Sequence, residues 1–206
     1  LDSVQFEKRS WQQRNRIKTR DAVLWLSIPV LTKGLYNQKL LDVEIDASQR
    51  FFDKHLKSIT HSYSNAEYFE EHIDELSLVL RKSHNLMVNL NIELIQWFCR
   101  CFSINTELVR SSSMDVQGKG SELLLEICDA VGAEIYLSTP GAKGYLESQD
   151  LFCTSDVALV YHSYTPCVYR QLYGEFEPYL SALDLLLNEG PASTPIIRAG
   201  RASLDM

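Results

Sequence analysis

The first part of the chain alternates apolar and polar residues with the period of a β-strand. Leu41, Val43 and Ile45 alternate with acidic residues, which is the pattern of a half-buried strand. This alternation predicts a strand at residues 41–46, the apolar, β-branched character of residues 1–6 predicts the end of another, and residues 14–18 and 22–30 are expected to form two strands around Thr19-Arg20-Asp21. The first of these strands is cut at its start, so we expect a further segment upstream of Leu1.

The middle of the chain has the period of a helix instead. Apolar residues recur at spacings of three and four, which places them on one face of each helix. The pattern predicts three packed amphipathic helices at residues 47–62, 65–81 and 85–102. Together they form a helical segment over about residues 47–103.

The last third alternates strands and helices. A strand at 106–110, a helix at 121–131 and a strand at 134–138 predict a βαβ unit with parallel pairing. A further strand is expected at 157–161 and a last helix at 178–187. The predicted fold class is therefore α/β: a partly parallel sheet with a βαβ unit in the C-terminal half and an inserted helical segment. We expect a single domain over residues 1–191 and a poorly ordered tail over 192–206.

Composition narrows the class of protein. Of 206 residues, 45% are hydrophobic and 23% are charged, which is ordinary for a protein with a real core. No apolar run approaches a membrane span, and no signal peptide is recognisable, so we expect a cytoplasmic protein without membrane insertion. The five cysteines lack CxxC spacing and read as reduced thiols. No HExxH pair is present, so neither a metal site nor a cofactor is predicted.

Charge is distributed unevenly along the chain. The formal net charge is −7, yet residues 1–20 contain six basic residues against two acidic ones. A short basic segment on an acidic protein favours local binding of one anionic small molecule, such as a nucleotide-sugar or another phosphate-bearing compound. It argues against nucleic acid, which would need a wide basic face.

The basic segment is the first candidate site. Guanidinium groups grip phosphate with two hydrogen bonds, and an indole ring can stack on a base or a sugar. On a strand, the side chains of Arg14, Arg16 and Lys18 would share one face. The candidate anion-binding residues here are Lys8, Trp11, Arg14, Asn15, Arg16 and Lys18. The alternative is a solvated charged hairpin with Trp11 as a core anchor.

Two loops after predicted strands form further candidates. The loop before the helix at 121–131 can present free N–H groups to an anion, although it fails the Walker pattern. The alternative is a polar connection with Ser121 as the N-cap. The second loop lies beyond the carboxyl end of a strand, where open sheets bind ligands. The candidate anion-binding residues of the two loops are Ser111, Ser112, Gly118, Lys119, Ser138, Lys143 and Tyr145. For Lys143 an ordinary surface lysine is the alternative.

Two carboxylates are candidates for the catalytic role. Asp184 lies among leucines in the last predicted helix, and Glu175 lies in the polar loop before it. A carboxylate buried at Asp184 would need a partner, for which we expect an arginine of the N-terminal segment. The alternative role for Asp184 is an ion pair that holds the two ends of the chain together.

Several stretches resemble the WbqC-like family along residues 1–191. The most specific are Asp2-Ser3-Val4-Gln5-Phe6 with Lys8 and Trp11, then Arg14-Asn15-Arg16 with Ile17. Further stretches are Val109-Arg110-Ser111-Ser112, Gly118-Lys119, Tyr136-Leu137-Ser138 and Gly174-Glu175-Phe176. The chain departs from the family at Gln13, where Asn is usual, in the spacing of loop 113–120, and in lacking the Gln-Pro-Tyr-type segment with which the family normally begins.

The resemblance implies a bacterial protein of O-antigen or other surface-polysaccharide biosynthesis. It implies a transferase that moves a small acyl or aminoacyl group of the glycyl type onto a nucleotide-linked sugar. Two other functions stay open: a non-catalytic module that binds a nucleotide-sugar or a protein partner, and an unrelated biosynthetic enzyme on the same fold. Whether the protein forms a homodimer also stays open.

Overall fold

The computed structural model describes residues 1–202. The chain forms two compact units. The larger unit contains residues 2–107 and 167–196, and the smaller one contains Leu1, residues 108–166 and the segment from Ile197 onward.

The larger unit is built on a β-hairpin. Strand β1 (Arg14–Lys18) pairs antiparallel with β2 (Val23–Ser27), with Arg14 opposite Ser27 and Lys18 opposite Val23. The turn between them is closed by the Thr19 hydroxyl, which hydrogen-bonds the backbone of Ala22. The predicted pair of strands is confirmed.

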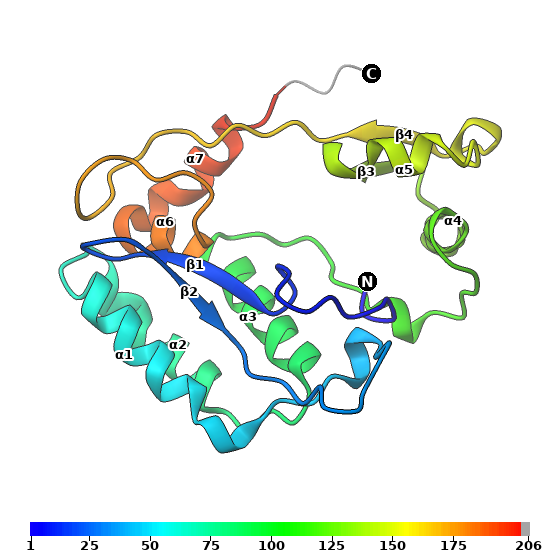
Figure 1. Ribbon diagram of the computed structural model, residues 1–206. Coiled ribbons are helices and arrows are strands. Elements are labelled where there is room, and N and C mark those ends of the chain that lie inside the picture. Colours follow the sequence, from blue (N-terminus) through cyan, green and yellow to red (C-terminus); the bar gives the residue numbers. More distant parts are fainter. Residues whose placement is uncertain (203–206) are drawn as a thin grey trace. The chain divides into compact units, whose positions relative to one another are not determined.

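Four helices accompany this hairpin. They are α1 (Phe51–Tyr63), α2 (Phe69–Arg81), α3 (Met87–Cys101) and α6 (Ala182–Glu189). Figure 1 shows the hairpin beside α1, α3 and α6. Their apolar faces supply the core, with Ile59, Leu76, Leu90, Trp97 and Leu186 all buried. The three predicted central helices are confirmed, since the periodic apolar stripes became the buried faces.

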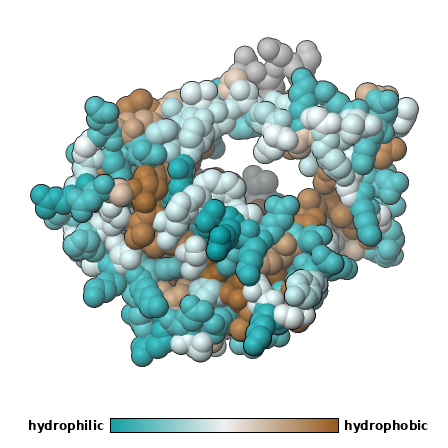
Figure 2. Space-filling view, in the orientation of Figure 1, coloured by the Kyte–Doolittle hydropathy of each residue, from teal (hydrophilic) through white to brown (hydrophobic). Residues whose placement is uncertain are grey.

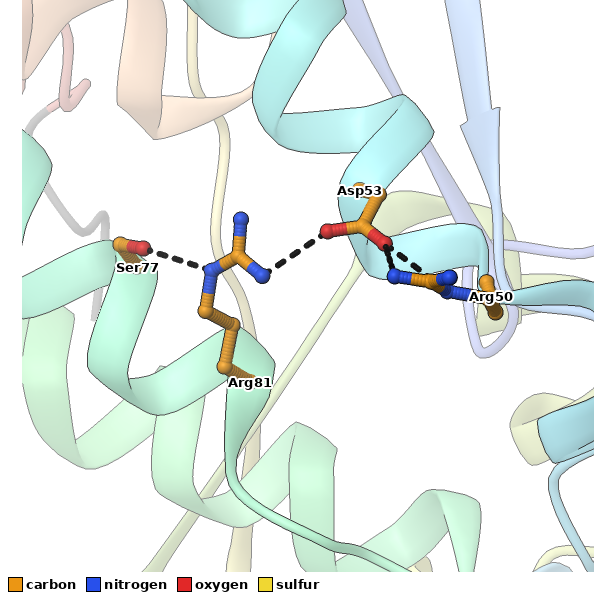
Figure 3. Close-up of polar contacts among 4 residues, drawn as sticks. All are labelled: Arg50, Asp53, Ser77 and Arg81. Atoms are coloured by element: carbon orange, nitrogen blue, oxygen red, sulfur yellow. Dashed lines mark hydrogen bonds and ion pairs between the residues drawn. The ribbon is translucent and has the colours of Figure 1, made fainter.

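An ion-pair network on the surface joins α1 to α2. Asp53 pairs with Arg50 at 2.8 Å and with Arg81 of α2 at 2.8 Å (Figure 3). Arg81 also donates from Nε to the Ser77 hydroxyl at 3.3 Å. These charges are partly or largely exposed, so the network adds little to stability but orients two helices that line the cavity described below.

The smaller unit contains α4 (Ser121–Val131), β3 (Ile135–Ser138), α5 (Lys143–Glu147) and β4 (Ala158–Tyr161). Strands β3 and β4 run parallel, with Ile135 opposite Ala158, which confirms a small parallel sheet in the C-terminal half. A cluster of Cys128, Leu146, Phe152 and Val157 forms its buried centre. Helix α4 ends at Gly132, which has φ 64° and caps the helix as predicted.

Some predicted strands are wrong. Residues 106–110 form no strand, so the parallel connection runs from β3 through α5 to β4 instead of through residues 106–138. Residues 41–46 begin in a 3-10 helix (Leu40–Asp42) and make only isolated bridges at Glu44 and Ile45. Residues 1–6 contribute one isolated bridge, between Gln5 and Lys39. Alternation alone did not reveal that these segments lack a continuous partner strand.

The end of the chain also differs in detail. The last predicted helix begins at Ala182 instead of residue 178, because the Ser181 side chain accepts a hydrogen bond from the Leu183 amide and caps it. In the segment expected to be poorly ordered, Ser193–Ala199 form helix α7. Residues 203–206 of that segment lie outside the described residues.

No helix in residues 1–202 is long and apolar enough to cross a membrane. Figure 2 shows apolar residues reaching the surface in separate areas among hydrophilic ones.

Candidate anion-binding site

A half-open cavity of about 450 Å³ lies between the hairpin and the helices of the larger unit. Its polar lining residues come mainly from the segment leading into β1, and its apolar ones from β2, α1, α2, α3 and α6. We call it the hairpin cavity. Its lining comprises Trp11, Gln12, Gln13, Arg14, Asn15, Leu26, Ile28, Phe51, His55, Ile59, Leu76, Leu80, Leu90, Asn91, Leu94, Ile95, Phe98, Ser181, Ala182 and Leu183.

Two arginines of β1 lie among indole rings, and of the two only Arg14 is a lining residue of the hairpin cavity. The Arg14 guanidinium lies 4.1 Å from the centre of the Trp25 ring, and that of Arg16 lies 5.7 Å from both Trp11 and Trp25. Neither arginine forms an ion pair within residues 1–202, and the Nε atoms of both are buried without a hydrogen-bond partner there. Trp11 is 63% exposed and its ring centre lies 5.2 Å from that of Trp25, so it is no core anchor.

The basic side chains on the predicted face of β1 differ in their contacts. Arg16 Nη2 donates to the carbonyl oxygens of Tyr179 at 2.7 Å and Pro178 at 3.3 Å. Lys18 is buried, and its ammonium donates to Gln171 Oε1 at 3.1 Å and to the carbonyl oxygen of Glu175. These carbonyl oxygens accept the hydrogen bonds of both side chains but carry no full negative charge, and Lys18 also has the buried Asp184 carboxyl nearby.

His55 of α1 also lines the hairpin cavity. Burial lowers the pKa of His55 below its usual 6.5, and a hydrogen bond with the Ser27 backbone acts in the opposite direction. The imidazole is therefore mainly neutral at pH 7 and can accept a proton. One signal for His55 is present in the sequence, namely a titratable residue within the apolar stripe of a helix, a stripe that by itself indicates only core packing.

Asp184 lies in a buried network below the hairpin. Its side chain is fully buried; Oδ1 accepts a 2.7 Å hydrogen bond from the Tyr63 hydroxyl, and Oδ2 accepts one of 2.8 Å from Tyr169. The Tyr63 oxygen in turn accepts from the Lys18 amide at 3.0 Å. The partners of Asp184 are thus two tyrosines and the nearby charge of Lys18. The prediction of an arginine partner from the N-terminal segment is wrong.

Burial dominates the electrostatics of this network. It raises the pKa of Asp184 above 3.8, while the hydrogen bonds from Tyr63 and Tyr169 act to lower it. Burial, together with the Asp184 charge, raises the pKa of Tyr63 far above its usual value, so this hydroxyl remains a donor. Glu175 enters the network only through its main-chain oxygen, and the residue itself is exposed. The network joins β1, α1 and α6.

The remaining predicted residues fall into two groups. Asn15 lines the hairpin cavity, whereas Lys8 is exposed and is not among its lining residues. The loop residues belong to the smaller unit, where Ser111 and Ser138 are buried and the others are exposed: Ser112, Gly118, Lys119, Lys143 and Tyr145.

Helix α4 begins differently from the expected arrangement. Gly120 is the N-cap, and Ser121 is the first helical residue, with a buried hydroxyl that has no partner in residues 1–202. The Tyr145 hydroxyl lies so close to Gly120 that an added Cβ would meet it at 1.8 Å. Lys143 lies 3.8 Å from Glu147 and 5.7 Å from the centre of the Tyr161 ring. Within residues 1–202, no three His, Cys, Asp or Glu side chains gather in a way that could hold a metal ion.

Comparison with known proteins places the chain in a family. The chain is 32% identical over 199 residues to the uncharacterized protein Rv1507c of Mycobacterium tuberculosis. The matched region covers 96% of this chain and 85% of that protein. No solved structure matches the chain significantly. The family model of the WbqC-like proteins matches residues 1–196. The chain therefore belongs to the WbqC-like protein family.

Proposed function

We propose that this protein is a transferase that moves an acyl or aminoacyl group onto a nucleotide-linked sugar in bacterial surface-polysaccharide biosynthesis. The hairpin cavity is its substrate site. The observation that carries the proposal is that Arg14, which lines this cavity, and Arg16, two positions further along β1, have no ion-pair partner in residues 1–202.

The arginines account for phosphate binding. No ion pair in residues 1–202 compensates the Arg14 or Arg16 charge, and a guanidinium group can bind phosphate through two hydrogen bonds. A diphosphate at the guanidinium groups would place the attached base or sugar next to the exposed ring of Trp11. An indole ring can stack on a nucleotide base or on the apolar face of a sugar ring.

His55 supplies the acid–base chemistry in this proposal. Its neutral imidazole takes a proton from the acceptor amino or hydroxyl group as that group attacks the carbonyl carbon of an activated acyl ester or thioester. The bond from that carbon to the leaving group then breaks, and the proton passes from His55 to the leaving group. The hydrogen bond with the Ser27 backbone fixes the ring for this transfer.

The buried carboxylate has a supporting role in the same proposal. Asp184 is fully enclosed, so it acts on the substrate site through its partners. By fixing Tyr63, which accepts from the Lys18 amide, it holds β1 in place on α1 and α6. That placement sets the positions of Arg14 and Arg16 on the same strand.

A binding experiment tests the site. Calorimetric titration of the full chain with UDP-, dTDP- and GDP-sugars is expected to show binding for at least one of them. Arg14→Gln should weaken that binding at least tenfold, since a hydrogen-bonded charge contributes about 1.5–3 kcal/mol. Arg20→Gln is the matched control, because Arg20 is an exposed arginine outside the hairpin cavity. No binding, or equal binding by the Arg14 variant, would reject the proposal.

A transfer experiment separates an enzyme from a binding module. With a bound nucleotide-sugar and aminoacyl or acyl thioesters, mass spectrometry should detect the acylated sugar. His55→Gln should bind the nucleotide-sugar but form product at least a hundredfold more slowly. Binding without product from any donor would favour a non-catalytic nucleotide-sugar protein.

A further inference from the structure

The interior of the hairpin cavity differs in chemistry from its rim. Arg14 and His55 are the titratable side chains among its lining residues. The others are mostly leucine, isoleucine and phenylalanine from β2 and the four helices. We propose that this interior holds the acyl group of the donor, and that the group is an apolar chain larger than glycyl. The inference rests on the proposed transferase function and names the donor class for the same site.

Volume argues against a glycyl group. At about 30 Å³ per water-sized group, a cavity of about 450 Å³ accommodates on the order of 15 such groups. A glycyl group has only an amine, a methylene and a carbonyl, and would leave most of the apolar wall uncovered. A chain of up to about ten carbons therefore fits inside the cavity and leaves room for its carboxyl end.

The polar lining residues are already engaged. Gln12 Oε1 accepts from the Glu7 amide at 2.8 Å, and Gln13 hydrogen-bonds both the Arg9 amide and the Ile28 carbonyl oxygen. Asn91 Nδ2 donates to the Gln12 carbonyl oxygen at 2.8 Å. These groups have little left for the hydroxyls of a sugar, which would lose hydrogen bonds to water on entering. An apolar chain carries no such penalty.

Charge completes the match to an amphipathic anion. The Arg14 guanidinium has no ion-pair partner in the described chain, and its Nε is buried. Burial lowers the pKa of His55, so this residue adds little positive charge inside at pH 7. When no nucleotide-sugar phosphate is bound at Arg14, the carboxylate of a free acid can pair with this guanidinium while its apolar body lies against α1, α2 and α3.

Chain-length dependence of binding tests the inference. The full chain is titrated with butanoate, hexanoate, octanoate and decanoate, each below its micelle concentration. The affinity is expected to rise about fourfold per methylene, which corresponds to about 0.8 kcal/mol, until the cavity is full. Burial of apolar surface should also give a negative heat-capacity change. Equal affinities along the series would overturn the inference.

Two variants that fill the cavity locate the effect. Leu94→Trp or Ala182→Leu should end the rise in affinity at a shorter chain, because both residues line the cavity. Leu78→Trp is the matched control, as Leu78 is 72% exposed on α2 and does not line it. If either folded filling variant behaves like the control, the chain binds elsewhere and the inference fails.

The two proposals can fail separately. Nucleotide-sugar binding without chain-length dependence would retain the transferase proposal and reject the apolar donor. Chain-length dependence that is sensitive to Leu94→Trp, without binding of any nucleotide-sugar, would retain the apolar acyl site and reject the sugar acceptor.

Discussion

The Tyr63 hydroxyl donates a 2.7 Å hydrogen bond to Oδ1 of Asp184, which joins α1 to α6 across 121 positions of sequence. The Tyr63 phenol oxygen also accepts a hydrogen bond from the Lys18 amide, so one phenol connects two helices and the strand that carries the arginines. A buried carboxylate with two phenol donors therefore fixes the support of the candidate site.

Removal of this phenol should destabilise the protein. In Tyr63→Phe, Asp184 loses one donor and the Lys18 amide loses its acceptor. A hydrogen bond to a charged group contributes about 1.5–3 kcal/mol, and we expect a loss of that order in the free energy of unfolding. Urea unfolding measures it. Tyr36→Phe is the control, because Tyr36 is 86% exposed. Equal effects of the two substitutions would contradict the role of the network.

The Asp184 carboxyl should make stability depend on pH. Its folded pKa is raised above 3.8, so the folded state binds more protons than the unfolded state between 3.8 and the raised value. Stability from this group therefore rises as the pH falls through that window and is lower above it. Asp184→Asn removes this pH dependence. The free energy of unfolding of the variant minus that of the wild type should therefore be more positive at pH 7 than at pH 4. Unfolding curves at both pH values test this, and a constant difference would contradict it.

His55 should act in the opposite direction. Its folded pKa is lowered below 6.5, so the unfolded state binds more protons as the pH falls through 6.5. The wild type should then lose stability relative to His55→Gln between pH 7 and pH 5. Proton NMR titration of the full chain checks the same point directly, with the His55 midpoint expected below 6.5. A midpoint at or above 6.5 would remove the basis for a neutral imidazole in the cavity.

The surface network of Figure 3 should contribute little by comparison. Asp53→Asn breaks its pairs with Arg50 and Arg81, which are largely exposed, at 75% and 51% of their side chains. We expect a loss below about 1 kcal/mol that shrinks further in high salt, because exposed pairs are screened. A loss as large as that of Tyr63→Phe would mean that the link between α1 and α2 carries more of the fold than its exposure indicates.

Gly190 should tolerate no side chain. It has φ 48°, and an added Cβ would meet ring atoms of Tyr68 at 2.4–2.5 Å. Gly190→Ala combines this clash with a backbone conformation that costs roughly 1–3 kcal/mol for other residues. Gly144→Ala is the matched control in α5, where nothing lies within 4 Å and alanine favours the helix. Thermal unfolding should show a large fall for the first variant only.

Local patterns determined much of the fold from the sequence alone. The hairpin follows from two alternating segments around Thr19-Arg20-Asp21, and α1, α2 and α3 follow from apolar stripes at helical spacing. Helix α4 and its end at Gly132 were predicted to the residue, since glycine capping is a local effect. Residues 106–110 and 41–46 were mistaken for strands, because strand formation needs a partner that the pattern does not specify.

The tertiary structure decided which polar residues act together. From the sequence, Arg14, Arg16 and Lys18 share one face of a strand, but only packing assigns Arg14 to a cavity and Lys18 to a buried network. The roles of Tyr63 and His55 depend on contacts with Asp184 and Ser27, far away along the chain. Periodicity reports which face of an element is apolar. It carries no information about which distant hydroxyl or carboxylate meets that face, because long-range packing sets those neighbours.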